Sequence, residues 1–133
     1  CFMRRVGTGS TNRFNKKYGE VGRLFQGPYK GKRVKTDNQL KYLLVYVMVK
    51  NSFEKYPGGI KEAMKNFDKT YEWAAKDPNC SLGDYAGIRK SPMIDKDLAN
   101  DFFENPHEFR NFAKECLDNN LDLEDIIENI KLD

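Results

Sequence analysis

One run of apolar residues with helical spacing constrains the fold of this chain more than any other feature. A helix-start signal precedes the run and a helix-stop signal follows it. Before the run, Thr36 and Gln39 form a capping box, and after it Pro57-Gly58-Gly59 stops a helix. The residues at i, i+3, i+4 and i+7 are Leu40, Leu43, Leu44 and Val47. A second, adjacent stripe contains Tyr42, Tyr46, Val49 and Phe53. The pattern predicts a central helix over residues 37–55 that buries the Leu40 stripe.

Shorter helical patterns lie on both sides of this central helix. They cover residues 2–18, 60–76, a short stretch after Asp95, residues 105–118 and residues 123–130. Asn105 as N-cap, Pro106 at the first helical position and Glu108 as capping residue mark one start clearly. The Gly-rich segment 19–35 is not helical and is expected to be extended, or a short strand if a partner strand exists. We therefore expect a mainly α fold of five or six helices with one extended basic segment.

The length of 133 residues is typical of one domain. We expect residues 1–91 to form a helical region and residues 92–133 to form an acidic helical extension packed on it.

The charges are divided unevenly along the chain. Residues 1–50 contain 12 Lys and Arg against Glu20 and Asp37, whereas residues 51–133 contain 11 Lys and Arg against 18 Asp and Glu. Cations attract phosphates and interleaved Tyr and Phe offer stacking faces for bases, so nucleic acid is the first partner to consider. The candidate nucleic-acid-binding residues are Arg13, Lys16, Lys17, Arg23, Lys30, Lys32, Arg33 and Lys35.

Composition also bears on location. No apolar run approaches the roughly 20 residues that cross a bilayer, and the first residues lack the apolar core of a secretory signal. Cys1, Cys80 and Cys116 form an odd set without a CxxC pair, which argues against a disulfide framework and favours the reducing cytoplasm. We expect no membrane partner and no organic cofactor.

The stretch "NRFNKKYGEVGRLFQGPYKGKRVKTDNQLKYLLVYV" (12–47) resembles the C-terminal half of the catalytic domain of single-tyrosine HUH transposases, in particular the REP-associated tyrosine transposase branch. Residues 71–87 resemble the following family segment weakly. By position Tyr46 matches the family's nucleophile, which attacks a DNA phosphodiester and holds the strand as a phosphotyrosine. The resemblance implies that residues 1–91 derive from a transposase.

The family also holds a divalent metal between two histidines of one strand, and the metal polarises the phosphate. This chain has His107 as its only histidine. The resemblance therefore implies a DNA-binding domain without the His-pair metal site, either a fragment of a longer enzyme or a remnant acting alone. Alternatively, Tyr46 is only a buried aromatic residue of the central helix.

The acidic end suggests a second hypothesis. Asp101 and Glu104 lie one helical turn apart, and His107 follows three residues later. Oxygen ligands with one imidazole suit Mn, Fe or Zn, and Mg is a further possible ion. A metal held there predicts the alternative function, a small metal-dependent phosphodiesterase that reuses the transposase scaffold. Helix capping explains the same residues without a metal.

The central helix has apolar residues on two sides, and the segment before it could expose a strand edge. Both surfaces need cover, so homodimerisation through this region is expected.

Overall fold

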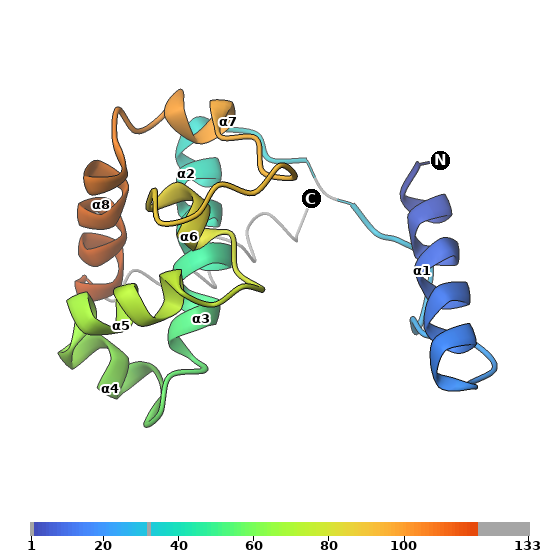
Figure 1. Cartoon of the computed structure of the whole chain (residues 1–133). Coiled ribbons are helices and arrows are strands. Elements are labelled where there is room, and N and C mark those ends of the chain that lie inside the picture. Colours follow the sequence, from blue (N-terminus) through green and yellow to red (C-terminus); the bar gives the residue numbers. More distant parts are fainter. Residues whose placement is uncertain (1, 32, 120–133) are drawn as a thin grey trace. The chain divides into compact units, whose positions relative to one another are not determined.

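The computed structural model describes residues 2–31 and 33–119 and consists mainly of helices (Figure 1). No strand occurs among these residues, and the prediction of a mainly α fold is confirmed. None of the described helices combines the length and the apolar character that crossing a bilayer requires. The chain divides into two compact units, of which the first ends at Arg33 and the second begins at Val34.

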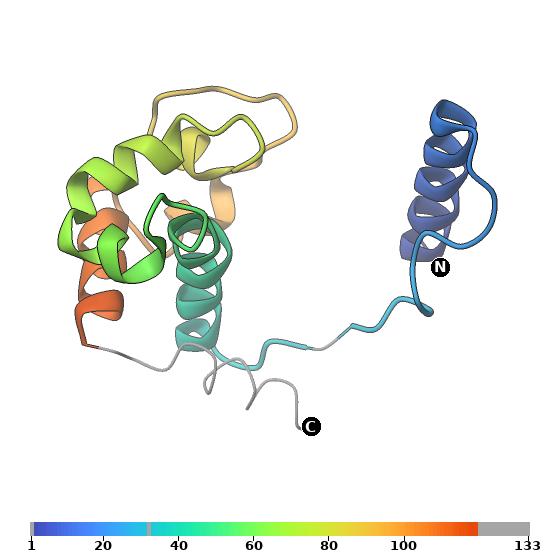
Figure 2. The ribbon, with the colours of Figure 1, turned by 90° about the horizontal axis from the view of Figure 1, so that it is seen from below.

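The N-terminal unit contains one long helix and the segment that follows it. Helix α1 spans Phe2–Tyr18, and residues 22–29 run back alongside it (Figures 1 and 2). Gly19 and Gly22 have φ angles of 69° and 106°, which only glycine adopts easily, and they turn the chain. The Asn15 side chain donates to the Gly22 carbonyl at 3.0 Å and fixes this turn. The predicted extended segment 19–35 thus folds back as bends and turns, without a strand in its described part.

The second unit contains the remaining helices. They are α2 (Asp37–Val45), the π-helical segment η1 (Tyr46–Lys50), α3 (Asn51–Phe53), α4 (Gly59–Lys65), α5 (Phe67–Ala75), α6 (Leu82–Tyr85), α7 (Asp97–Asn100) and α8 (Pro106–Asp118). Helices α2, η1 and α3 follow one another without a break and form the central helix that the sequence predicts. Within this unit α8 and the central helix run along its length, α4 and α5 lie at one end and α7 at the other (Figure 1).

The central helix buries a different face from the predicted one. Val47 is 53% exposed and Leu40, Leu43 and Leu44 are only half-buried, whereas Val45, Met48, Val49 and Phe53 are buried. The buried face contains Val49 and Phe53 of the second stripe together with Val45 and Met48, which belong to neither stripe, and aromatic contacts to the other helices lie on the second stripe. The Phe53 ring lies 5.3 Å from Phe67 of α5, and Tyr42 lies 5.6 Å from Phe112 of α8.

The predicted helix 60–76 is interrupted at Asn66, whose φ and ψ of −120° and 46° are not helical. The buried Thr70 hydroxyl donates to the Ala63 carbonyl at 3.1 Å, which satisfies a group that the break leaves without its helical partner. The Asn66 amide also donates to the Glu62 carboxylate at 3.2 Å. A single helix over this range was therefore the wrong prediction.

Both predicted caps are present. The Thr36 hydroxyl accepts a hydrogen bond from the backbone N–H of Gln39 at 3.2 Å. The Asn105 side chain accepts one from the backbone N–H of Glu108 at 2.9 Å. The Glu108 carboxylate accepts in return from the Glu104 amide at 2.7 Å. The predicted helix 123–130 lies outside the described residues, and the proposed boundary between residues 91 and 92 stays a prediction.

Candidate functional site

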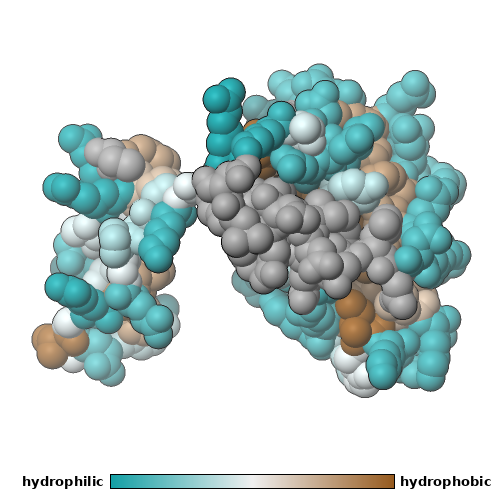
Figure 3. All heavy atoms as spheres, turned by 180° about the vertical axis from the view of Figure 1, so that it is seen from behind, coloured by the Kyte–Doolittle hydropathy of each residue, from teal (hydrophilic) through white to brown (hydrophobic). Residues whose placement is uncertain are grey.

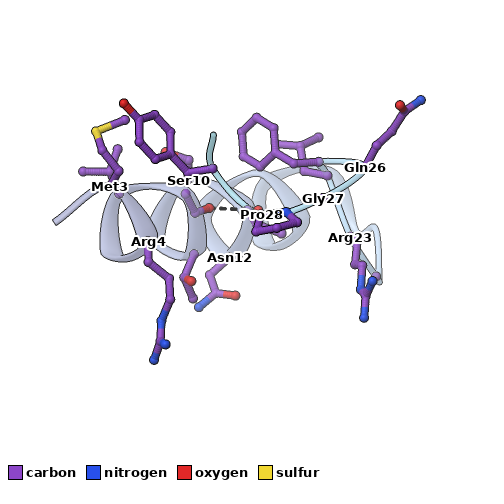
Figure 4. Close-up of a pocket in the computed structure, with 16 residues that line it drawn as sticks. Met3, Arg4, Ser10, Asn12, Arg23, Gln26, Gly27 and Pro28 are labelled. Atoms are coloured by element: carbon purple, nitrogen blue, oxygen red, sulfur yellow. Dashed lines mark hydrogen bonds between the residues drawn. The ribbon is translucent and has the colours of Figure 1, made fainter. Parts of the chain in front are cut away.

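A groove runs along the N-terminal unit between the first turns of α1 and the segment that folds back on it (Figure 4). Its apolar lining comes from Met3, Val6, Leu24, Phe25, Pro28 and Tyr29. Phe25 and Tyr29 are 54% and 61% exposed, so their ring faces are open to a ligand. The Tyr29 ring lies over Gly31, where an added Cβ would come within 2.9 Å of the Tyr29 hydroxyl. Glycine at position 31 therefore makes room for this aromatic side chain.

Two arginines lie at the groove. Arg4 comes from α1 and Arg23 from the returning segment, and in Figure 4 both side chains extend to the same side of the helix. The polar groups that line the groove are hydroxyls and amides, including Ser10, Asn12 and Gln26, and no acidic side chain lines it. The groove thus combines apolar side chains with two arginines, which extend to the side of the helix opposite Met3 (Figure 4), and this combination suits an anionic ligand that carries flat or apolar groups.

The predicted basic residues gather largely in this unit. Arg13, Lys16 and Lys17 lie at i, i+3 and i+4 in the second half of α1, and all three are exposed. Arg23 lies in the returning segment, Lys30 and Arg33 come after it, and all three are exposed. Lys32 lies outside the described residues. Lys35 belongs to the second unit, where its backbone amide donates to the Gln39 side chain at 3.0 Å.

Arg4 and Arg5 carry the same exposed charge but were not among the predicted binding residues. The resemblance that guided the prediction begins only at residue 12, although the absence of any acid in α1 was a signal in the sequence. No ion pair involves a cation of the N-terminal unit within the part of it that the structure describes. The Lys17 ammonium lies 5.0 Å from the Tyr18 ring centroid. These charges are therefore available to an external anion.

Tyr46 is the first residue of η1 and packs half-buried against the core of the second unit. The Lys50 ammonium lies 5.0 Å from its ring centroid and 3.2 Å from the Glu54 carboxylate. A π-helical turn is rare in proteins and occurs frequently at functional sites. This position is compatible with both interpretations of Tyr46, the former nucleophile and the helix-packing aromatic residue.

The predicted metal ligands have separate surroundings. Asp101 and Glu104 are exposed around the end of α7, and His107 is exposed in the first turn of α8, where its Nδ1 lies 3.1 Å from the Asn111 amide. Among residues 2–31 and 33–119, no three His, Cys, Asp or Glu side chains are grouped so that they could hold a metal ion. The structure does not bring the three residues together. The phosphodiesterase hypothesis that depends on them stays a prediction.

A buried ion pair that the sequence did not predict organises the turn-rich segment after α5. The fully buried Asp84 carboxylate accepts from Arg89 Nη2 at 2.7 Å and Nε at 3.0 Å, and from the Ser91 amide at 2.6 Å. Arg89 also donates to the carbonyls of Asp77 and Cys80. The hydrogen bonds from Arg89 hold the pKa of Asp84 below its ordinary value. The cluster is fully used in joining these turns, so we assign it a structural role.

No family model matches the chain, and no similar curated protein or solved structure was found.

Proposed function

We propose that the chain is a DNA-binding protein derived from a single-tyrosine HUH transposase, and that its N-terminal unit contacts the nucleic acid. The observation that carries the proposal is the set of exposed cations on α1 and the returning segment, beside a groove with open aromatic faces. The first 33 residues contain nine Lys and Arg and only one acid, Glu20. The resemblance of residues 12–47 to the transposase family also points to DNA as the partner.

The physical basis of binding is release of the counterions that surround the phosphates. Arg13, Lys16 and Lys17 lie on one side of α1 and can approach neighbouring phosphates together. Phe25 and Tyr29 offer ring faces on which unpaired bases can stack, since base–aromatic stacking does not depend on base identity. The proposed mode is therefore phosphate attraction by the helix with base contacts in the groove.

We do not expect this chain to cut DNA alone. The family's reaction uses a metal held by a histidine pair, and His107 is the only histidine of the chain. We further propose a cytoplasmic location, which an odd number of cysteines without a CxxC pair supports.

The test is fluorescence anisotropy with labelled single-stranded and hairpin DNA across a salt series. We expect the combined Arg13→Ala, Lys16→Ala and Lys17→Ala changes to weaken binding and to lower the salt slope by about three, because each phosphate contact contributes roughly one. The matched control is Lys55→Ala, Lys61→Ala and Lys69→Ala, which removes three exposed cations from the second unit. Absence of binding even at low salt, or an equal loss in both triple variants, would overturn the proposal.

A further inference from the structure

The N-terminal unit lacks a core of its own. No residue in its described part is buried, and its apolar side chains lie among polar ones on the surface (Figure 3). The exposed large apolar residues are Phe2, Met3, Val6, Phe14, Tyr18, Val21, Leu24, Phe25 and Tyr29. Such a density of exposed apolar side chains in about 30 residues marks an interaction surface, because a unit of this size cannot cover them itself.

The groove defines the chemistry of what covers it. Its lining includes apolar side chains together with Arg4 and Arg23, and no acid lines it. A peptide segment rich in both apolar and acidic side chains would bury the apolar ones against the groove and place acids near the arginines. A neutral or basic segment would leave both arginines without a partner.

The chain itself contains such a segment. Residues 120–133, with the sequence NLDLEDIIENIKLD, lie outside the described residues and include five acids, one lysine and six Leu or Ile. The acids are Asp122, Glu124, Asp125, Glu128 and Asp133. We propose that the groove of the N-terminal unit binds the acidic C-terminal segment, residues 120–133, of a second copy of this chain.

Each copy offers one groove and one acidic segment, so two copies can exchange them reciprocally. The exchange closes a symmetric pair and leaves no groove open for a third copy. Two equivalent contacts also double the buried area, which matters because stable interfaces bury roughly 1,200–2,000 Å² in total. This interface differs from the one expected around the central helix. It forms without nucleic acid, and the segment and the bases of a bound strand would compete for the groove.

The test is sedimentation equilibrium of the full chain without DNA. We expect a dimer at micromolar concentrations that weakens as salt is added, because the pairing is partly electrostatic. The groove variant Arg4→Glu with Arg23→Glu and the segment variant Glu124→Lys with Glu128→Lys should each raise the dissociation constant at least tenfold. The four changes combined in one chain should restore the dimer, since the charges are again complementary.

The matched control is Glu72→Lys with Glu115→Lys, two exposed acids of the second unit, which should leave the dissociation constant unchanged. Helical circular dichroism confirms that each variant is folded. A monomeric full chain, a dimer that survives either reversal, or four combined changes that fail to restore it would overturn the inference. Anisotropy with DNA is a separate measurement, so failure of the proposed function leaves this result interpretable.

Discussion

At the residue scale, the Asp84–Arg89 pair gives the clearest expectation for stability. Replacement Asp84→Asn removes the charge that Arg89 faces and leaves a half-buried guanidinium without its anion. We expect the midpoint of thermal unfolding to fall by several degrees. The matched control is Asp68→Asn, because Asp68 pairs with Arg110 but is 70% exposed, and exposed pairs contribute only about 0–1 kcal/mol.

The same residue predicts a pH dependence. A carboxyl whose folded pKa lies below its ordinary value stabilises the folded state above that ordinary value, about 4, and the stabilisation is lost as the pH falls through the folded pKa. The difference in thermal midpoint between the unchanged chain and Asp84→Asn should therefore shrink as the pH is lowered from 7 to 3. Equal differences at both pH values would show that the charge of Asp84 does not matter.

Tyr71 gives a prediction at alkaline pH. Its hydroxyl is buried without a hydrogen-bond partner among the described residues, and burial raises the pKa of Tyr71 to about 12. In the unfolded state this phenol ionises near pH 10, whereas in the folded state it stays protonated to about pH 12. The contribution of Tyr71 to the free energy of unfolding is therefore lost as the pH rises from 10 to 12.

Tyr71→Phe keeps the ring contacts with Phe67 and Arg110 and removes the unpaired hydroxyl. We expect urea unfolding at pH 7 to show equal or slightly higher stability. Ultraviolet absorbance should show one fewer phenol titrating near pH 12. A clear loss of stability at pH 7 would mean that the hydroxyl has a bonding partner.

At the element scale, local signals predicted most helices because caps join residues only three positions apart. Thr36 with Gln39 and Asn105 with Glu108 are such pairs. The π-helical segment and the break at Asn66 do not follow from the apolar spacing, and each accepts a side-chain hydrogen bond from another element. Cys80 donates its thiol to the Met48 carbonyl within η1, and Thr70 donates to Ala63. No pattern along the chain shows these bonds.

The π-helical segment leads to a deletion test. A π turn holds more residues than an α turn, so removal of one residue from Tyr46–Lys50 should convert it to α-helix and keep Val45 and Phe53 on the buried face. Val47 is the suitable residue because it is exposed. We expect the chain without Val47 to keep its helical circular dichroism and to unfold cooperatively.

Deletion of Glu115, which is exposed within the regular helix α8, is the matched control. It rotates Cys116 and Leu117 off the buried face and should lower the thermal midpoint strongly. If the Val47 deletion is the more damaging of the two, the extra residue of η1 is needed for folding.

At the scale of the whole molecule, every buried residue of the described chain lies between Val45 and Leu117. A chain that begins at Val34 keeps all of them. We expect it to fold alone, with a thermal midpoint within a few degrees of the full chain at dilute protein concentration. A large loss of helical signal in residues 34–133, beyond that of α1, would show that the first unit supports the second.

The charge of the candidate site could be predicted from the sequence, but its shape could not. Phosphate-attracting Lys and Arg interleaved with aromatic residues are visible without coordinates, and Arg13, Lys16 and Lys17 lie where a helix was expected. The groove exists because Gly22 turns the chain and Asn15 holds that turn, and together they bring residues 22–29 back alongside α1. The Asp84–Arg89 pair escaped prediction because its partners are joined by turns rather than by a regular period.

The absence of buried side chains in the N-terminal unit has a consequence for how the two parts of the gene can evolve. Substitutions among residues 2–31 remove no buried side chain, so selection for a folded, abundant product should act weakly on most of them, outside the turn formed by Gly19 and Gly22, and selection for binding should dominate. Under mutational scanning for abundance this region should be permissive at most positions outside the turn at Gly19 and Gly22, whereas positions such as Phe53 and Leu82 should tolerate few replacements.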